Sequence, residues 1–240
     1  MSGSIRLHVA TPLAAGTVVS VTPAQAHYLA TVMRRAVGAP VRLFNGADGE
    51  WAATIVALGR DHARLLVQHP LRAQTAEPDL WLAFALLRRD ATDLAVQKAT
   101  ELGAALLLPL LTARTGAARV NTGRLAAIAT EAAEQSERLT VPRIAAPQGL
   151  SALLAGWPPA RPLFAAIERA AAPPIAPHAD PAGLLPAGLL IGPEGGFAPA
   201  ELDELARHPF VRPVSLGARI LRAETAAIVG LALLQAPGGG

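Results

Sequence analysis

The sequence predicts an α/β fold with a mostly parallel sheet, preceded by a small β-barrel domain. Short segments that alternate or are rich in β-branched residues dominate the chain between Ile5 and Leu71, with turns between them. After Leu71, apolar strands alternate with helical segments, which is typical of a parallel sheet covered by helices on both faces. The 240 residues are enough for one large domain or two ordinary ones.

The N-terminal part is expected to contain five short strands and one helix. The strands are expected at residues 5–10, 17–21, 40–45, 50–57 and 63–68. Turn signals at Asn45-Gly46 and Asp48-Gly49 separate two of them. Thr22 is expected to cap a helix over residues 23–33 that begins with a proline. Short strands around one helix favour a small barrel.

A polar, turn-rich connector at residues 72–79 precedes a change in composition, so we place domains at 1–74 and 75–240. In the second domain, strands are expected at 80–87, 104–111, 163–167 and 189–191. One helix is expected at 92–102, a second from Asn121 or Thr122 to about 139, and a third that begins at Pro199. Residues 170–187 are expected to form a Pro/Ala-rich connection. The last helix, 225–235, is apolar almost all round. Such a helix is expected to be buried on every side, which favours a dimer interface at a chain end.

Composition excludes several classes of site. The chain has no cysteine, which excludes disulfides, thiolate metal sites and cysteine nucleophiles, and we expect no metal. The first six residues lack the apolar core of a signal peptide. No apolar run approaches the roughly eighteen residues that span a bilayer. We therefore expect a cytoplasmic protein that does not associate with membranes.

The basic excess is confined to the N-terminal part. Residues 1–74 hold seven arginines and three acids, a charge of +4, whereas residues 75–240 hold 14 basic and 15 acidic groups, a charge of −1. This asymmetry is typical of a nucleic-acid-binding module joined to a neutral catalytic one. Arg34 and Arg35 directly follow the expected helix, where one phosphate can meet both; the alternative is an interaction with the helix dipole.

Two glycine-containing turns near the C-terminus are the strongest candidates for a ligand site. An apolar strand stops at Gly192-Pro-Glu-Gly-Gly196, and a second strand-turn-helix unit contains Leu216-Gly-Ala-Arg-Ile-Leu221. Glycines at the ends of parallel strands let a ligand approach the backbone closely. One shared site for a polar ligand is therefore expected, with simple turn geometry as the alternative.

Four sequence blocks resemble a known family. They are residues 97–103, 131–136 with Val141-Pro142, 191–196 and 216–226. In this order and spacing they are similar to the bacterial small-subunit (16S) ribosomal RNA uridine-N3 methyltransferases of the SPOUT superfamily. Residues 27–33 and 41–55 resemble that family's PUA-like N-terminal barrel, which binds RNA. The chain departs from the family at 112–115, where only Arg114 of a Glu-Arg-Ser block is kept, and at Arg88-Arg89-Asp90, which replaces Lys-Gly-Asp.

The resemblance implies S-adenosylmethionine as methyl donor, a homodimer formed through the C-terminal domain, and a C-terminal trefoil knot whose loops hold the donor. It implies small-subunit ribosomal RNA, free or in the assembled subunit, as the partner. The residues expected to contact the donor are Ile191, Gly192, Glu194, Gly195, Gly196, Leu216, Gly217, Ile220 and Leu221. The arginines expected to contact RNA are Arg6, Arg34, Arg35, Arg42 and Arg114.

Methylation of uracil N3 requires loss of the N3 proton, because the nitrogen lone pair is otherwise tied into the ring imide. The base must also leave its stack. Arg222, with Arg114 or Arg219, is a candidate to stabilise the uracil anion. Glu224 is a candidate to stabilise the positive charge of the sulfonium. The alternative for Glu224 is that it is simply an acid at a helix N-terminus, where it interacts with the helix dipole.

Lys98 is the only lysine among 21 basic residues, and a lysine can lose its proton where an arginine cannot. We therefore consider it a candidate to assist proton transfer or to orient the uracil. The alternative is a surface lysine paired with Glu101.

Two other functions remain open at this point. One keeps the SPOUT fold but methylates a ribose 2′-hydroxyl or a transfer RNA, which the 131–136 and 216–226 blocks disfavour. The other is a non-catalytic RNA-binding assembly factor whose glycine turns are only structural.

Overall fold

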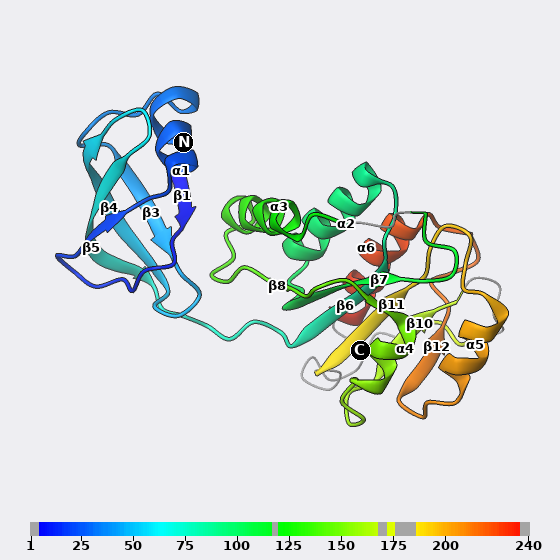
Figure 1. The fold of residues 1–240 in the computed structure, drawn as a ribbon. Helices are drawn as coiled ribbons and strands as arrows, with labels where there is room; N and C mark the ends of the chain where they lie inside the picture. Colours follow the sequence, from blue (N-terminus) through cyan, green and yellow to red (C-terminus); the bar gives the residue numbers. More distant parts are fainter. Residues whose placement is uncertain (1–4, 117–119, 168–171, 176–185, 236–240) are drawn as a thin grey trace. The chain divides into compact units, whose positions relative to one another are not determined.

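The computed structural model describes residues 5–116, 120–167, 172–175 and 186–235 (Figure 1). Most of the expected connection at 170–187 therefore lies outside the described residues. The chain divides into two compact units. Unit 1 consists of Met1–Ala76 and Ala133–Val141, and unit 2 consists of Glu77–Ala132 and Pro142–Gly240. The N-terminal unit thus takes in a short segment from the middle of the chain, which nothing in the sequence pattern indicated.

Unit 1 is built on a five-stranded sheet in the order β1-β3-β4-β5-β2. Its strands are β1 (Ile5–His8), β2 (Val18–Ser20), β3 (Pro40–Phe44), β4 (Glu50–Leu58) and β5 (Ala63–Arg72). β1 and β3 are parallel, and the other pairs are antiparallel. All five predicted strands are confirmed. Their alternating apolar side chains form one core, centred on Leu7, Leu43 and Leu65.

The predicted helix of unit 1 is α1 (Pro23–His27), which continues as a π-helical turn, η1 (Tyr28–Val32). Thr22 caps it as expected, because its Oγ1 accepts the backbone N–H of Gln25 at 3.2 Å. The Gln25 side chain accepts the Thr22 N–H in return, which completes a capping box.

Unit 2 is built on a seven-stranded sheet in the order β12-β10-β11-β6-β7-β8, with β9 paired to β7. The strands are β6 (Leu80–Ala85), β7 (Leu106–Leu111), β8 (Arg143–Ile144), β9 (Gln148–Gly149), β10 (Leu163–Ala166), β11 (Ala187–Ile191) and β12 (Val211–Val214). All of these pairs are parallel, which confirms the mostly parallel sheet. β11 follows β10 in the chain but lies between β10 and β6, so the strand order is not the sequence order.

The described residues after β6 form five helices: α2 (Arg89–Glu101), α3 (Thr122–Gln135), α4 (Leu150–Ala155), α5 (Pro199–Ala206) and α6 (Ala223–Gln235). The first four lie between strands, and α6 follows the last strand, β12. Asn121 caps α3, because its side-chain oxygen accepts the Arg124 N–H at 3.0 Å. α3 ends at Gln135 instead of near residue 139, since Glu137 takes a left-handed φ of 59°. Helix α4 and strands β8 and β9 have weak periodicity and were not predicted.

The last helix, α6, packs on the sheet through one face. Ala223, Ala227, Leu231 and Leu234 are buried, whereas Ala232 is exposed. Gly230 allows a close approach to β11, because a Cβ there would lie 2.6 Å from a methyl carbon of Leu189. The expected burial on every side is therefore not found within the single chain. None of the helices in the described ranges has the length and apolarity that crossing a membrane requires.

Candidate functional site

The candidate site of unit 2 is a cavity of about 910 Å³ at one edge of the parallel sheet. β10 lies between β11 and β12, and the three strands are parallel, so the loops that follow them leave the sheet at the same edge. The cavity is lined by the ends of these strands and by the two glycine turns that follow β11 and β12. Ligands of α/β sheets bind in this position, outside the carboxyl ends of the strands. The volume lies within the usual range for small-molecule sites, roughly 300–1,000 Å³.

Close packing and backbone conformation explain why glycine occupies two positions in these turns. A Cβ on Gly192 would lie 2.9 Å from the ring of Phe197, which is buried, so a side chain here would displace the ring. Gly217 has a φ of 118°, a backbone conformation that residues with a Cβ rarely adopt. Its N–H donates to Ser215 Oγ at 3.2 Å, which fixes the second turn.

The structure brings the predicted donor contacts together. All nine lie in the wall of this one cavity: Ile191, Gly192, Glu194, Gly195, Gly196, Leu216, Gly217, Ile220 and Leu221. Arg114, Arg219 and Arg222 line the same cavity. The two turns therefore form one site, although their individual roles stay predictions.

Charge in the cavity wall is strongly positive. Within the described part of the chain, four arginines line it, Arg88, Arg114, Arg219 and Arg222, against one acid, Glu194. Arg88 was noted in the sequence only as a departure from a family block, and its place in the cavity was not foreseen. Nothing in the local sequence identifies Arg88 as a lining residue, because it reaches the cavity only where the loop after β6 lies beside the loop after β11.

Two family models match this chain. Residues 74–235 match an RNA methyltransferase domain, and residues 21–68 match an RNA methyltransferase PUA domain. The chain belongs to this RNA methyltransferase family. The ribosomal RNA small subunit methyltransferase E of Rickettsia conorii is 35% identical over 209 residues, which are 87% of this chain and 85% of the relative. The protein of the same name from Synechocystis is 36% identical over 238 residues, which are 96% of this chain and 77% of the relative.

Solved structures agree with this assignment. A putative methyltransferase from Legionella pneumophila, solved with its cofactor S-adenosylmethionine bound, superposes with a TM-score of 0.86 at 28% identity and covers 99% of both chains. The ribosomal RNA small subunit methyltransferase E of Neisseria gonorrhoeae shares the fold at 24% identity, with a TM-score of 0.81 and 97% of each chain covered.

In this methyltransferase the glycine turn after β11 is tied to the loop after β7. Arg114 Nη1 donates to the carbonyl oxygen of Gly195 at 2.7 Å. Glu201, in the first turn of α5, accepts the Ala113 N–H through one carboxylate oxygen at 2.8 Å and the Ala198 N–H through the other at 2.7 Å. Sequence reasoning did not single out Glu201. The proline two residues before it indicates a helix start and hence a capping role, but not the second partner.

The two remaining catalytic candidates differ in their surroundings. Lys98 is not among the described residues that line the cavity. Its Nζ lies 2.9 and 2.8 Å from the two carboxylate oxygens of Glu101, so it forms the ion pair expected of a surface lysine. Glu224 lies in the first turn of α6, and both Ala223 and Ala226 beside it line the cavity. The Oε2 atom of Glu224 is buried and has no hydrogen-bond partner within the described part of the chain.

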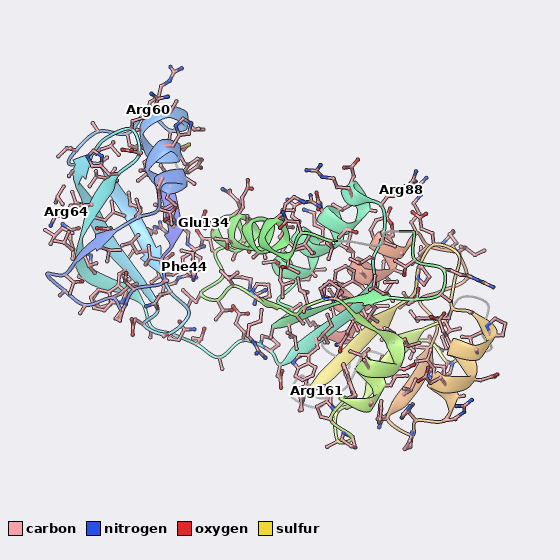
Figure 2. All side chains as sticks on the ribbon, in the orientation of Figure 1. Phe44, Arg60, Arg64, Arg88, Glu134 and Arg161 are labelled. Atoms are coloured by element: carbon pink, nitrogen blue, oxygen red, sulfur yellow. The ribbon has the colours of Figure 1, made fainter. Side chains whose placement is uncertain are left out.

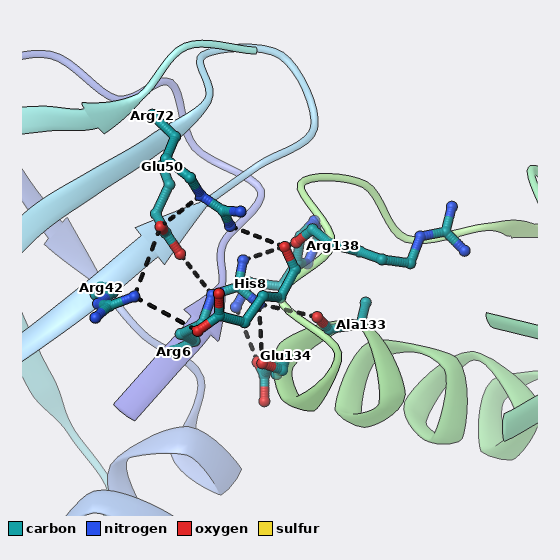
Figure 3. A network of polar contacts seen from close by, with 9 residues as sticks. Arg6, His8, Arg42, Glu50, Arg72, Ala133, Glu134 and Arg138 are labelled. Carbon is teal, nitrogen blue, oxygen red and sulfur yellow. Dashed lines mark hydrogen bonds and ion pairs between the residues drawn. The ribbon is translucent and has the colours of Figure 1, made fainter. Parts of the chain in front are cut away.

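Arg6 was expected to contact RNA, but the structure gives it a structural role inside unit 1 (Figure 3). Its side chain is only 4% exposed and its guanidinium forms a hydrogen-bonded ion pair with Glu50. The same guanidinium donates to the carbonyl oxygens of Ala133, Glu134 and Arg138 and lies 4.5 Å from the centroid of the Phe44 ring. These partners, 127 to 132 positions away in the chain, hold the segment Ala133–Val141 in unit 1.

The other predicted RNA contacts are distributed over three places. Arg42 forms two long ion pairs: its Nη1 lies 3.9 Å from a carboxylate oxygen of Glu50 and 3.7 Å from one of Glu137. Arg34 is exposed in a left-handed conformation after η1, and Arg35 beside it is partly buried. Arg114 lies in the cavity of unit 2. The described residues contain no group of three or more metal-ligating side chains close enough to hold a metal ion.

Proposed function

We propose that this chain is an S-adenosylmethionine-dependent methyltransferase that methylates N3 of a specific uridine in small-subunit (16S) ribosomal RNA. The observation that carries the proposal is the convergence of two glycine turns on one cavity at the carboxyl edge of the sheet. Relatives named ribosomal RNA small subunit methyltransferase E, and the donor bound in the Legionella structure, support it. The N3 position follows from the resemblance of the four sequence blocks.

The cavity residues fit the donor. Gly192, Gly195 and Gly217 line the cavity without side chains, so a ligand can approach the backbone closely, while Leu216, Ile220 and Leu221 supply apolar surface for an adenine ring. When bound, S-adenosylmethionine supplies the methyl group. Glu224 is not itself a lining residue, but it lies between the lining residues Ala223 and Ala226, and one of its carboxylate oxygens is buried without a hydrogen-bond partner among the described residues. In this proposal that carboxylate favours the positive charge of the sulfonium.

The substrate base needs stabilisation of negative charge, because removal of the N3 proton places that charge on the ring carbonyl oxygens. Arg222 lines the cavity and is exposed, and its guanidinium has no polar partner among the described residues, so it is available to those oxygens. An arginine stays protonated near neutral pH and offers several N–H donors, which suits it to this role. The pairing of Lys98 with Glu101 leaves Lys98 without a catalytic task in this proposal.

The finer structural features belong to the same proposal. We propose a trefoil knot for the strands and loops around β11 and β12, a PUA-like barrel for the sheet of unit 1, and domains near residues 1–74 and 75–240. We propose a homodimer through the part of α6 that the single chain leaves uncovered, which would account for its apolar sequence. We propose a cytoplasmic enzyme, because its proposed substrate, small-subunit ribosomal RNA, free or in the assembled subunit, is found there.

Two measurements test the function. Calorimetry with S-adenosylmethionine is expected to show heat of binding in the wild-type protein; its absence would favour a non-catalytic RNA-binding factor. Mass mapping of small-subunit ribosomal RNA from a deletion strain is expected to show one missing base-methylated uridine. A lost ribose methyl group, or a lost methyl group in transfer RNA, would instead identify the alternative SPOUT activity.

A further inference from the structure

The arginines of the cavity exceed what the methyl donor requires. Among the residues that the structure describes, the wall holds four arginines and one glutamate, a charge of +3 (4 − 1), although residues 75–240 as a whole carry −1. S-adenosylmethionine is itself a cation, since its sulfonium and ammonium groups outnumber its single carboxylate. Two like charges about 4 Å apart repel by roughly 1 kcal/mol even in a water-like medium. The donor's carboxylate can occupy at most one or two of these arginines, so the others serve a different anion.

The four arginines are not equivalent. Arg114 is tied to the carbonyl oxygen of Gly195, and Arg222 is the candidate for the uracil anion. Arg88 and Arg219 remain (Figure 2 labels Arg88). The Arg88 side chain is 84% exposed, and its Nε lies 4.0 Å from a carboxylate oxygen of Glu194. Arg219 is exposed and has no hydrogen bond or ion pair with any other described residue. Because a long ion pair between exposed side chains adds little stability, neither arginine is needed to hold the described fold.

Their positions bracket the cavity. Arg88 precedes α2 on the loop after β6, whereas Arg219 lies in the second glycine turn after β12. The two therefore reach one cavity from loops that follow different strands of the sheet. Ile220, next to Arg219, is 65% exposed and adds an apolar surface beside the charge. Cations from separate loops beside exposed apolar surface suit a nucleic-acid strand, whose phosphates and bases alternate.

We propose that Arg88 and Arg219 bind the RNA phosphates that flank the target uridine, so that unit 2 holds the RNA backbone itself. The inference rests on the proposed function and deepens it. A nucleotide that leaves its stack carries its flanking phosphates toward the cavity. Arginines at two sides of that cavity then fix the displaced strand, whereas a basic N-terminal unit alone would bind RNA without placing the base.

The test uses the full chain with Arg88→Gln and Arg219→Gln combined, and a single-stranded uridine-rich RNA oligonucleotide as the probe. Binding is measured at several salt concentrations. Each phosphate contact contributes about 0.7 to the slope of log affinity against log salt for single strands, so the slope is expected to fall by about 1.4. The affinity at low salt is expected to fall at least about tenfold, and the affinity for S-adenosylmethionine to stay within about twofold.

A matched control carries Arg143→Gln and Arg207→Gln. These arginines are exposed residues of unit 2, they do not line the cavity, and their loss changes the net charge equally. If both double variants show the same slope, the inference is overturned. It is also overturned if the Arg88/Arg219 variant loses affinity mainly for S-adenosylmethionine. Failure of the wild-type protein to bind S-adenosylmethionine would instead refute the proposed function, while the RNA slopes could still be compared.

Discussion

The carboxylate of Glu201 accepts a hydrogen bond from the backbone N–H of Ala113, 88 positions earlier in the chain, over a distance of 2.8 Å. The other carboxylate oxygen caps α5 through the Ala198 N–H. One side chain thus joins the loop after β7 to the segment that leaves the first glycine turn. Arg114, the neighbour of Ala113, completes the link by its bond to the Gly195 carbonyl.

Replacement of Glu201 by Gln is therefore expected to loosen the donor site. The amide keeps one oxygen acceptor but turns its NH₂ group toward a backbone N–H, so one hydrogen bond is lost. Hydrogen bonds to charged groups contribute about 1.5–3 kcal/mol, and we expect a loss of about that size, divided between the free energy of unfolding and donor binding. Urea unfolding and calorimetry with S-adenosylmethionine measure the two parts.

Asp203→Asn is the control for Glu201→Gln. Asp203 lies on the same helix, is exposed, and has no polar contact with another described residue, so the change removes one charge without removing a bond. Equal donor affinity in the two variants would show that Glu201 does not position the site.

The difference between Glu201 and the glycine turns shows how far sequence reasoning reaches. Gly192 and Gly217 are recognisable locally, because a strand, a turn and a helix follow one another within a few residues. Parallel strands then bring both turns to one edge, which makes a shared site predictable. The bond from Glu201 to Ala113 depends on which two loops lie side by side, and no local pattern contains that information.

Arg6 shows a similar limit to what a count of charged residues in the sequence can predict. Counting arginines correctly marks the N-terminal part as basic, but it does not separate a solvated arginine from a buried one. Arg6 is buried because Glu50 compensates its charge and three backbone carbonyls from a distant segment accept its N–H groups. Two of those carbonyls, of Ala133 and Glu134, lie in the last turn of α3, where helix carbonyl groups can accept hydrogen bonds from other groups.

The Glu50 carboxylate is expected to make the stability of unit 1 depend on acid pH. Burial alone would raise the pKa of Glu50, but hydrogen bonds and charges from Arg6 and Arg72 outweigh it and hold the pKa below its usual value of 4.5. The unfolded chain therefore binds the proton more readily than the folded one. The stabilisation is fully present above the unfolded pKa and is lost as the pH falls below 4.5 through the folded pKa.

Urea unfolding between about pH 7 and pH 3 measures this dependence. Glu50→Gln is expected to lower stability by about 3–5 kcal/mol at neutral pH, because it leaves Arg6 buried and unpaired, and to flatten the acid dependence. Glu137→Gln, at a carboxylate that is 61% exposed, is expected to change neither. If the acid dependence of Glu50→Gln matches that of the wild type, another carboxylate is responsible. Should Glu50→Gln fail to fold, Arg72→Gln removes one source of the pKa shift and keeps Arg6 paired.

Gly217→Ala is expected to weaken donor binding by about tenfold. The added methyl group meets no atom within 4 Å, but the φ of 118° is strained for any residue with a Cβ, so the turn must change its conformation. Such strain costs on the order of 1–3 kcal/mol. Gly16→Ala is the matched control, because Gly16 also has a positive φ, 80°, and open space around it, but lies in unit 1. Calorimetry should separate them; unchanged donor affinity in Gly217→Ala would remove the second turn from the site.

Lys98→Arg is expected to leave methyl transfer unchanged at every pH. Lys98 lies outside the cavity wall, and its ammonium group contacts both carboxylate oxygens of Glu101. The guanidinium of an arginine at this position can keep that ion pair. Arg222→Lys is the contrasting variant, since it keeps the charge in the cavity but loses the planar set of donors; its turnover is expected to fall about 10- to 100-fold, a loss of roughly 1.4–2.8 kcal/mol.

Both variants are assayed by transfer of labelled methyl groups to small-subunit ribosomal RNA at several pH values between about pH 6 and pH 9, because the rate of a step that needs a general base depends on pH. A wild-type profile in Lys98→Arg means that the lysine serves only the surface of α2. A profile in which Lys98→Arg loses its activity at one pH limb would show the opposite, because only a group that exchanges its proton in that range can produce it. The proton acceptor would then be Lys98 after all, and its pairing with Glu101 would have to open when RNA binds.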